Sequence, residues 1–176
     1  MRKIKNAELG RKSVDEFKSA GKIPLVVLLD NVRSMNNIGS VFRTADAFLV
    51  EAIYLCGITA QPPHREIEKT ALGATDSVTW KYFASTLEAI EELAAKNFTV
   101  IAIEQAESGK LLDEFPIEKN KKYALIFGHE MNGVGEEVMA KVHAAIEVPQ
   151  AGTKHSLNIS VCAGVVLWEF FKGMKE

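Results

Sequence analysis

Short, nearly continuous apolar runs recur along the chain. Runs of this kind, without polar alternation, are typical of strands buried on both faces of a parallel sheet. They predict strands at residues 24–29, 52–56, 78–83, 98–103, 123–127 and 144–148. The longer stretches between them predict helices at residues 38–49, 66–72, 86–96, 136–141 and 157–172.

Strands and helices alternate throughout, with no linker and no internal repeat between them. This alternation predicts an α/β domain with a mainly parallel sheet and helices on both faces. Ligands of such domains usually bind at the carboxyl ends of the strands. We therefore expect functional residues in the segments that directly follow strands.

Composition narrows the class of protein. Of the 176 residues, 47% are hydrophobic and 25% are charged, as in ordinary globular domains. No apolar run approaches the roughly 20 residues of a membrane helix, and the charged N-terminus lacks the apolar region of a signal peptide. Cys56 and Cys162 form no CxxC pair and lie in apolar runs, which predicts reduced, buried thiols and a cytoplasmic protein.

Charge is distributed unevenly. The net charge of −2 argues against nucleic-acid binding by bulk charge. Residues 1–22 nevertheless carry +4, from Arg2, Lys3, Lys5, Arg11, Lys12, Lys18 and Lys22 against Glu8, Asp15 and Glu16. We therefore divide the chain into a basic N-terminal extension, residues 1–22, and a domain, residues 23–176. The extension could contact phosphates, although a solvated helix face is the simpler explanation of its charge taken alone.

The segment after the first predicted strand, residues 30–45, contains the first unusual polar pattern. Asn37 can cap the helix expected to begin at Ile38, and Gly39 would let another backbone approach closely. Arg43 could clamp a phosphate with its planar fork, or could be an ordinary surface residue. Because Arg43 is six residues after Asn37, both would face one cleft only if Asn37 projects from the loop before the helix.

Two further polar segments follow later strands. In residues 127–135 a strand ends in Gly128, His129 and Glu130 before a Gly-rich turn that lacks the P-loop and dinucleotide patterns. A flexible turn with Glu130 capping the next helix would explain it. In residues 148–161, Ser156 can cap the last helix with Asn158 in its first turn, where free N–H groups could also meet a ligand.

Several other kinds of site are disfavoured by spacing. The four histidines are scattered, without an HExxH motif or a Cys/His pair, so we expect no metal. No GxSxG elbow supports a serine hydrolase.

Together these segments resemble the SpoU (TrmH) family of RNA ribose methyltransferases, within the SPOUT superfamily. Motif one of that family, Asn-x-Gly-x-x-x-Arg-Thr/Ser-Ala, matches residues 37–45. Motif two, Phe-Gly-x-Glu-x-x-Gly, matches residues 127–133. Motif three, Ile/Val-Pro-x-x-Gly and then Ser-Leu-Asn-Val/Ile-Ser, matches residues 148–152 and 156–160. The likeness covers roughly residues 24–172.

The resemblance implies a fold and a cofactor. Residues 124–170 would form a deep C-terminal trefoil knot, an exception to ordinary chain connections. S-adenosylmethionine would lie bent in the knot, held mainly by backbone. The residues around it would be Ile103, Glu104, Gln105, Gly128, Ile146, Glu147, Val148, Ser156 and Leu157. Two subunits would pair through the knot as a homodimer, and each RNA site would draw on both chains.

The resemblance also implies a catalytic set, which is Asn37, Arg43, Glu130, Ser156 and Asn158. A ribose 2′-hydroxyl is a poor nucleophile, so its proton must be accepted or its developing charge stabilised. A free guanidinium is a very weak base. Our hypothesis is that Arg43 engages the 2′-oxygen and the adjacent phosphate while the other four residues orient it.

The chain departs from the family pattern at Leu49, where relatives commonly have Gly, and at Gln150, where many have Met. Residues 1–22 replace the separate RNA-binding domain of some relatives, which favours transfer RNA over ribosomal RNA as the target. Two other readings remain open. One is a non-catalytic RNA-binding module with a degenerate pocket, and the other is a nucleotide- or NAD-binding enzyme, which the missing motifs disfavour.

Overall fold

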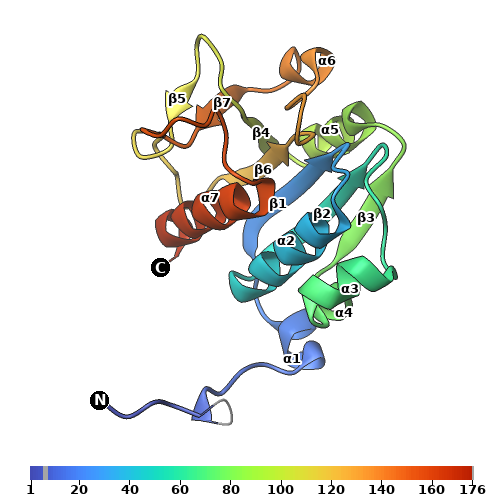
Figure 1. The fold of residues 1–176 in the computed structure, drawn as a ribbon, viewed down its shortest axis with the longest axis vertical. Helices are drawn as coiled ribbons and strands as arrows, with labels where there is room; N and C mark the ends of the chain where they lie inside the picture. Colours follow the sequence, from blue (N-terminus) through green and yellow to red (C-terminus); the bar gives the residue numbers. More distant parts are fainter. Residues whose placement is uncertain (6–7, 176) are drawn as a thin grey trace.

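The computed structural model describes residues 1–5 and 8–175, and these contain one seven-stranded sheet in which every paired strand is parallel. The strands lie in the order β3-β2-β1-β6-β4-β7-β5. Their bounds are β1 Ile23–Asp30, β2 Val50–Cys56, β3 Trp80–Phe83, β4 Phe98–Ile103, β5 Lys110–Leu111, β6 Lys122–Phe127 and β7 Ala144–Glu147. The predicted parallel α/β architecture is confirmed (Figure 1).

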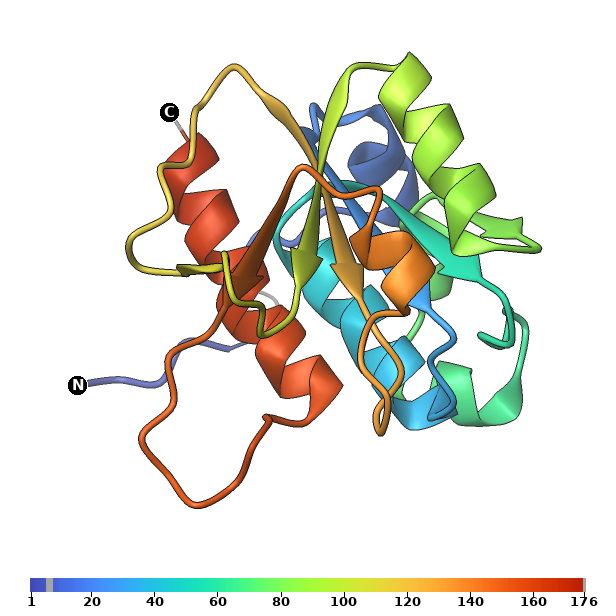
Figure 2. The same ribbon diagram turned by 90° about the horizontal axis from the view of Figure 1, so that it is seen from above.

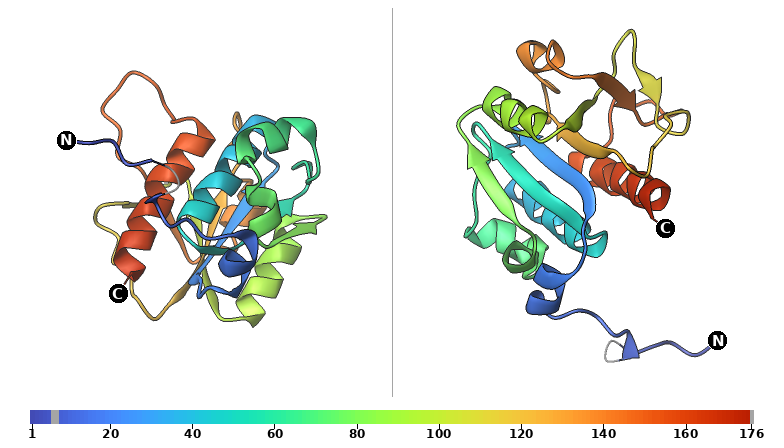
Figure 3. Two further views of the ribbon diagram at one scale, coloured as in Figure 1. Left: turned by 90° about the horizontal axis from the view of Figure 1, so that it is seen from below. Right: turned by 180° about the vertical axis from the view of Figure 1, so that it is seen from behind.

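Helices cover both faces of this sheet (Figures 2 and 3). They are α1 Val14–Ser19, α2 Met35–Ala47, α3 Arg65–Ala71, α4 Ala74–Ser77, α5 Thr86–Ala95, α6 Glu136–Met139 and α7 Ile159–Met174. Along β1 the side chains alternate between two cores. Leu25 and Val27 pack with α2, α3 and α7, whereas Val26 and Leu28 pack with α5 and α6. Both faces of β1 are therefore buried, as its unbroken apolar run predicted.

The close packing of α2 on α3 depends on Gly39. A Cβ atom at this position would lie 2.2 Å from the carbonyl oxygen of Ile67 and 2.2 Å from Oγ1 of Thr70, so no larger side chain fits. This confirms the close backbone approach predicted for Gly39. Just beyond α2, Leu49 adopts a positive φ of 54°, a conformation that glycine adopts at little cost, which explains why glycine suits this position in relatives.

Three short elements, α1, α4 and β5, were not predicted. Helix α1 carries a capping box between Ser13 and Glu16, and its Phe17 is buried in the same core as α2 and α7. Residues 1–5 lie away from the body of the molecule (Figure 1). Strand β5 is only two residues long and pairs with β7 at the edge of the sheet. Among the described residues, no helix is both long and apolar enough to cross a membrane.

Candidate active site

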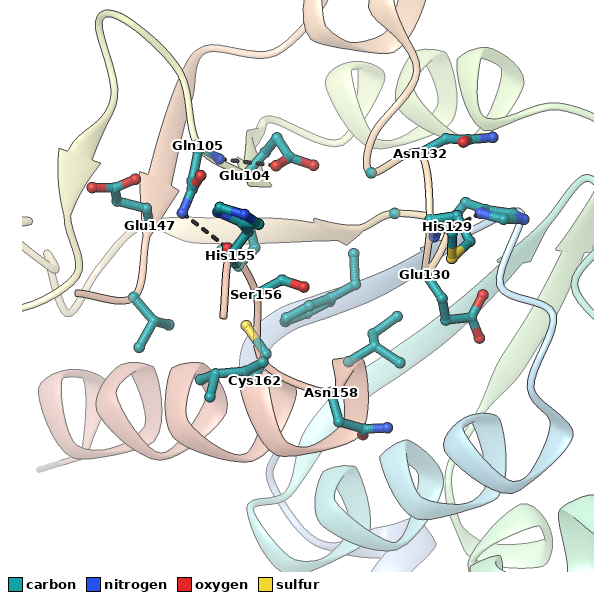
Figure 4. Close-up of a pocket in the computed structure, with 18 of the residues that line it drawn as sticks. Glu104, Gln105, His129, Glu130, Asn132, Glu147, His155, Ser156, Asn158 and Cys162 are labelled. Carbon is teal, nitrogen blue, oxygen red and sulfur yellow. Dashed lines mark hydrogen bonds between the residues drawn. The ribbon is translucent and has the colours of Figure 1, made fainter. Parts of the chain in front are cut away.

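A cavity of about 530 Å³ opens where β4, β6 and β7 end, next to the first turn of α7 (Figure 4). All the residues expected to hold the cofactor line it except Ile146. Ile146 is instead fully buried in β7, where its carbonyl accepts a hydrogen bond of 3.0 Å from the N–H of Glu104. Its role in this geometry is to hold the end of β4, and the cavity wall beside it comes from Glu147 and Val148.

The turn of motif two has one well-defined conformation. His129 and Gly133 exchange backbone hydrogen bonds of 3.0 and 2.8 Å across it. A Cβ atom on Gly128 would lie 2.2 Å from the carbonyl carbon of Gly133, so the turn folds back onto the strand end. The Glu104 carboxylate accepts a further 3.0 Å hydrogen bond from the N–H of Val134. The Gly-rich sequence allowed a flexible turn, but these hydrogen bonds hold the segment in one conformation.

Glu130 joins motif two to the start of α2. Its carboxylate accepts hydrogen bonds from the backbone N–H groups of Arg33, at 3.1 Å, and Ser34, at 2.9 Å. Burial alone would raise the pKa of Glu130, but these bonds and one from the Asn37 side chain lower it overall. The alternative that Glu130 caps the next helix is wrong, because its carboxylate bonds the loop that leads into α2, and α6 has no side-chain cap.

Asn37 lies inside α2 rather than before it. The helix begins at Met35, and its N-cap is Ser34, whose hydroxyl accepts a hydrogen bond from the N–H of Asn37. The prediction that Asn37 caps a helix starting at Ile38 is therefore wrong. Its side chain lies between motifs two and three. Its Oδ1 accepts a 3.2 Å hydrogen bond from Nδ2 of Asn158, and its interaction with the Glu130 carboxylate helps to lower the pKa of Glu130.

Asn158, not Ser156, is the N-cap of α7. Its Oδ1 accepts hydrogen bonds of 2.9 Å from the N–H and 2.7 Å from the hydroxyl of Ser160. Because a backbone N–H can only donate, the Asn158 amide must present its NH₂ group to Asn37. Asn37 must then present its own NH₂ group to Glu130. The polar side chains of the three motifs thus meet at Asn37, and Figure 4 shows Glu130 and Asn158 both pointing toward α2.

Ser156 and Arg43 lie outside this group of side chains. Ser156 lines the cavity and is exposed. Arg43 is also exposed but does not line the cavity. Six residues of α-helix rotate a side chain by about 600°, so Arg43 points about 120° away from Asn37. The condition set for both residues to face one cleft of the same chain is therefore not met.

The charge of the cavity is negative. Glu104, Glu130 and Glu147 line it, and among the described lining residues none is Lys or Arg. Cys162 also lines it, and burial, together with the charge of Glu104, raises the pKa of this thiol to about 11. Cys162 is only partly buried, so the prediction of a buried thiol holds fully for Cys56 alone. No cluster of His, Cys, Asp or Glu suited to a metal occurs within the described ranges.

Sequence reasoning missed several lining residues, which are Phe127, His129, Met131, Asn132, Gly133, Gln150, His155, Ile159 and Cys162. All but Cys162 fall inside the three motif segments, so their neighbourhood was the available signal. Cys162 lies one helical turn after Asn158, and this spacing could have placed it on the same side of α7.

Comparison with known proteins agrees with this geometry. The model of the SpoU rRNA Methylase family matches residues 24–168. A tRNA (guanosine(18)-2′-O)-methyltransferase of Thermus thermophilus is 32% identical over 92% of this chain and 81% of its own length. The crystal structure of an AdoMet-bound rRNA methyltransferase from Sinorhizobium meliloti is 29% identical, with a TM-score of 0.79 over 92% of this chain and 61% of its own.

A TrmH/SpoU tRNA modifying enzyme from A. aeolicus has the same fold, with 24% identity and a TM-score of 0.80 over 91% of this chain and 80% of its own. The family model extends from the second residue of β1 into α7 and so contains the whole cavity. The chain belongs to the SpoU rRNA methylase family.

Proposed function

We propose that this chain transfers a methyl group from S-adenosylmethionine to a ribose 2′-hydroxyl of transfer RNA. The observation that carries the proposal is the meeting of the three motifs at the edge of an acidic cavity, where Asn158 donates a hydrogen bond to Asn37 and Asn37 helps to lower the pKa of Glu130. A degenerate pocket in a non-catalytic module would have no reason to keep three distant motifs joined in this way. The name of the Thermus relative supports transfer RNA as the substrate class.

The cavity fits the proposed cofactor in size and charge. Its volume of about 530 Å³ lies within the range of about 300–1,000 Å³ usual for small-molecule sites. S-adenosylmethionine carries a sulfonium and an ammonium group, which suit a wall containing Glu104 and Glu147. The phosphates of NAD or ATP would be repelled by the same carboxylates, which argues against the nucleotide-binding alternative.

When bound, S-adenosylmethionine supplies a methyl group on a positively charged sulfur, open to in-line attack by an oxygen. The chain's own residues must then place the 2′-hydroxyl and deal with its proton. Glu130 is poorly suited to accept that proton, because its carboxylate already accepts two backbone hydrogen bonds and its pKa is lowered. Glu130, Asn37, Asn158 and Ser156 are therefore orienting groups, and Arg43 is left to engage the 2′-oxygen and the neighbouring phosphate.

In a homodimer, Arg43 would join the active site of the partner subunit, because it does not line the cavity of its own chain. Val161, Val165 and Trp168 form an exposed apolar stripe along α7, with exposed fractions of 54%, 41% and 51%. Stripes at this spacing are typical of helix faces that pack against a partner. In the proposed dimer this stripe pairs two subunits, and each RNA site takes Arg43 from the partner.

Three finer points belong to the same proposal. Residues 124–170 would form the trefoil knot, an expectation supported by the sheet order, in which the consecutive strands β6 and β7 flank β4. Residues 1–22 would act as a basic extension of the domain at residues 23–176 and contact RNA phosphates. The work would be done in the cytoplasm, where thiols such as Cys56 stay reduced.

Ribosomal RNA is the second candidate, favoured by the name of the Sinorhizobium structure. The deciding experiment incubates the chain with methyl-labelled S-adenosylmethionine and either total transfer RNA or ribosomal RNA, followed by nucleoside analysis. We expect a 2′-O-methylated nucleoside in transfer RNA alone. Label only in ribosomal RNA would change the substrate class, and no label in either pool would refute the proposed reaction.

A further inference from the structure

A second hollow, of about 320 Å³, adjoins the cofactor cavity. It is lined by Arg33, Ser34, His129, Glu130 and Met131, and the last three of these also line the cavity. The two spaces therefore share one wall, the turn of motif two. Arg33 lines only the hollow and has no part in the proposed methyl transfer, so its exposed side chain beside the cavity needs a separate explanation.

The side chains around the hollow are free to meet a ligand. The Met131 side chain is exposed, with an exposed fraction of 83%. The Arg33 side chain is also exposed, and within residues 1–5 and 8–175 its guanidinium makes no hydrogen bond or ion pair. Nδ1 of His129 accepts a 3.0 Å hydrogen bond from the N–H of Met131, so the neutral ring carries its proton on Nε2. The hollow thus offers a thioether, a guanidinium plane and an imidazole with one N–H donor.

These groups suit a flat unsaturated ring better than a phosphate. Unpaired RNA bases are commonly bound by stacking on histidine rings or arginine guanidinium planes, and a thioether makes favourable contacts with aromatic rings. A phosphate would meet the ionised Glu130 carboxylate. It would also find the N–H groups of Arg33 and Ser34 already donated to that carboxylate.

The position of the hollow selects which base it would take. The base and the 2′-hydroxyl of one nucleotide are attached to neighbouring carbons of the same ribose. A 2′-hydroxyl held beside Glu130 and Asn158 in the cavity would leave its own base on the far side of the shared wall. We propose that the hollow binds the base of the nucleotide to be methylated, with Arg33, His129 and Met131 in contact with it. This inference rests on the proposed methyl transfer and adds the residues that select the target base.

The test uses the full chain and the variants Arg33→Ala and Met131→Ala, singly and combined. Loss of stacking contacts of this kind should raise the KM for RNA roughly tenfold in the double variant. In Arg33→Ala the kcat and the Kd for S-adenosylmethionine should stay unchanged, because the Arg33 side chain belongs neither to the catalytic set nor to the lining of the cofactor cavity. Matched controls are Arg65→Ala and Leu72→Ala, which remove another exposed arginine and an exposed apolar side chain on and beside α3.

A second readout separates a selective contact from a structural one. With two RNAs that differ only in the target base, the ratio of their kcat/KM values should fall toward one in the double variant. An unchanged KM and an unchanged ratio would overturn the inference, as would a fall in kcat alone or loss of the homodimer. If wild-type protein transfers no methyl group at all, the proposed function fails first. The inference then fails too unless the double variant binds RNA roughly tenfold more weakly by fluorescence titration.

Discussion

Helices α2 and α7 differ between their N-terminal ends and their sides. The polar side chains at the ends have hydrogen-bond partners within the chain, whereas side chains along the sides are exposed. At the N-terminal ends, Asn37 and Asn158 bond each other across 121 positions of sequence, and Glu130 bonds the start of α2. Along the sides, the apolar stripe of α7 is exposed, and Arg43 on α2 does not line the cavity of its own chain. The chain completes the first region by itself, whereas we propose that the second is completed by a partner subunit.

The exposed side is nevertheless held in place. The Trp168 ring lies 5.8 Å from that of Phe48, which follows α2, and 6.1 Å from that of Phe171. Such aromatic groupings fix ring orientation, so the face is ordered before any partner arrives. An exposed apolar face on α7 and an arginine on α2 that does not line the cavity of its own chain are the features that the proposed homodimer with shared sites would use.

The largest expected effect comes from placing a charge in the stripe. In Val165→Asp the new carboxylate would have to be buried unpaired in the dimer, which costs roughly 3–5 kcal/mol and weakens association by about two to nearly four orders of magnitude. Light scattering should then show monomers, and methyl transfer should fall with the dimer. Leu72→Asp, which changes an exposed apolar residue beside α3, should remain dimeric and active. A fully active Val165→Asp monomer would mean that one chain holds a complete site.

The second effect concerns the arginine itself. Arg43→Ala should lower kcat by about 10²–10³, the usual result of removing a charge-stabilising donor, with the Kd for S-adenosylmethionine unchanged. An Asn158→Ala chain should also be nearly inactive. If each site combines Arg43 of one subunit with Asn158 of the other, a mixed dimer of these variants has one intact site and recovers about half of the wild-type rate. No recovery would assign Arg43 and Asn158 to the same chain's site.

A smaller loss is expected from changing Asn37, where the three motifs meet. Asn37→Asp replaces the NH₂ donor that faces Glu130 with a second carboxylate. The two like charges should raise the pKa of Glu130 and loosen its hold on α2. We expect a fall in kcat of about tenfold to a hundredfold, measured by methyl transfer at saturating RNA. Asn36→Asp, one residue away and exposed, is the matched control and should behave as wild type.

Local sequence patterns predicted the long elements of the fold but not the contacts between them. Apolar runs located the long strands, because burial on both faces leaves a continuous signal in the chain. Helix α1 escaped prediction because it buries only Phe17. The start of α7 was misplaced because Ser156 and Asn158 are both good N-cap residues, and only the fold decides between them. Tertiary contacts such as that between Asn37 and Asn158 decide which motif residues meet, and local sequence patterns do not contain this information.

The smallest expected effect concerns Glu92, a carboxylate that, unlike Glu130, does not line the cavity. Glu92 accepts hydrogen bonds from Lys81 at 2.7 Å, Lys96 at 2.5 Å and the Tyr54 hydroxyl at 2.8 Å. These bonds lower the pKa of Glu92 from 4.5 to about 2. Since the folded pKa lies below the unfolded one, the stabilisation is complete above about pH 4.5 and is lost as the pH falls toward 2. The carboxylate is partly exposed, so its contribution should be no more than about 1 kcal/mol.

Glu92→Gln should therefore lower the midpoint of thermal unfolding by a few degrees at pH 7 and leave methyl transfer unchanged. The difference from wild type should vanish as the pH approaches 2. Glu130→Gln should do the reverse. Its stability change should be slight because the side chain is exposed, but methyl transfer should drop because an amide cannot accept from both Arg33 and Ser34 and still face the NH₂ group of Asn37. Unfolding curves from pH 2 to 7 beside transfer assays measure both. Equal losses of activity in the two variants would mean that Glu130 supports only the fold.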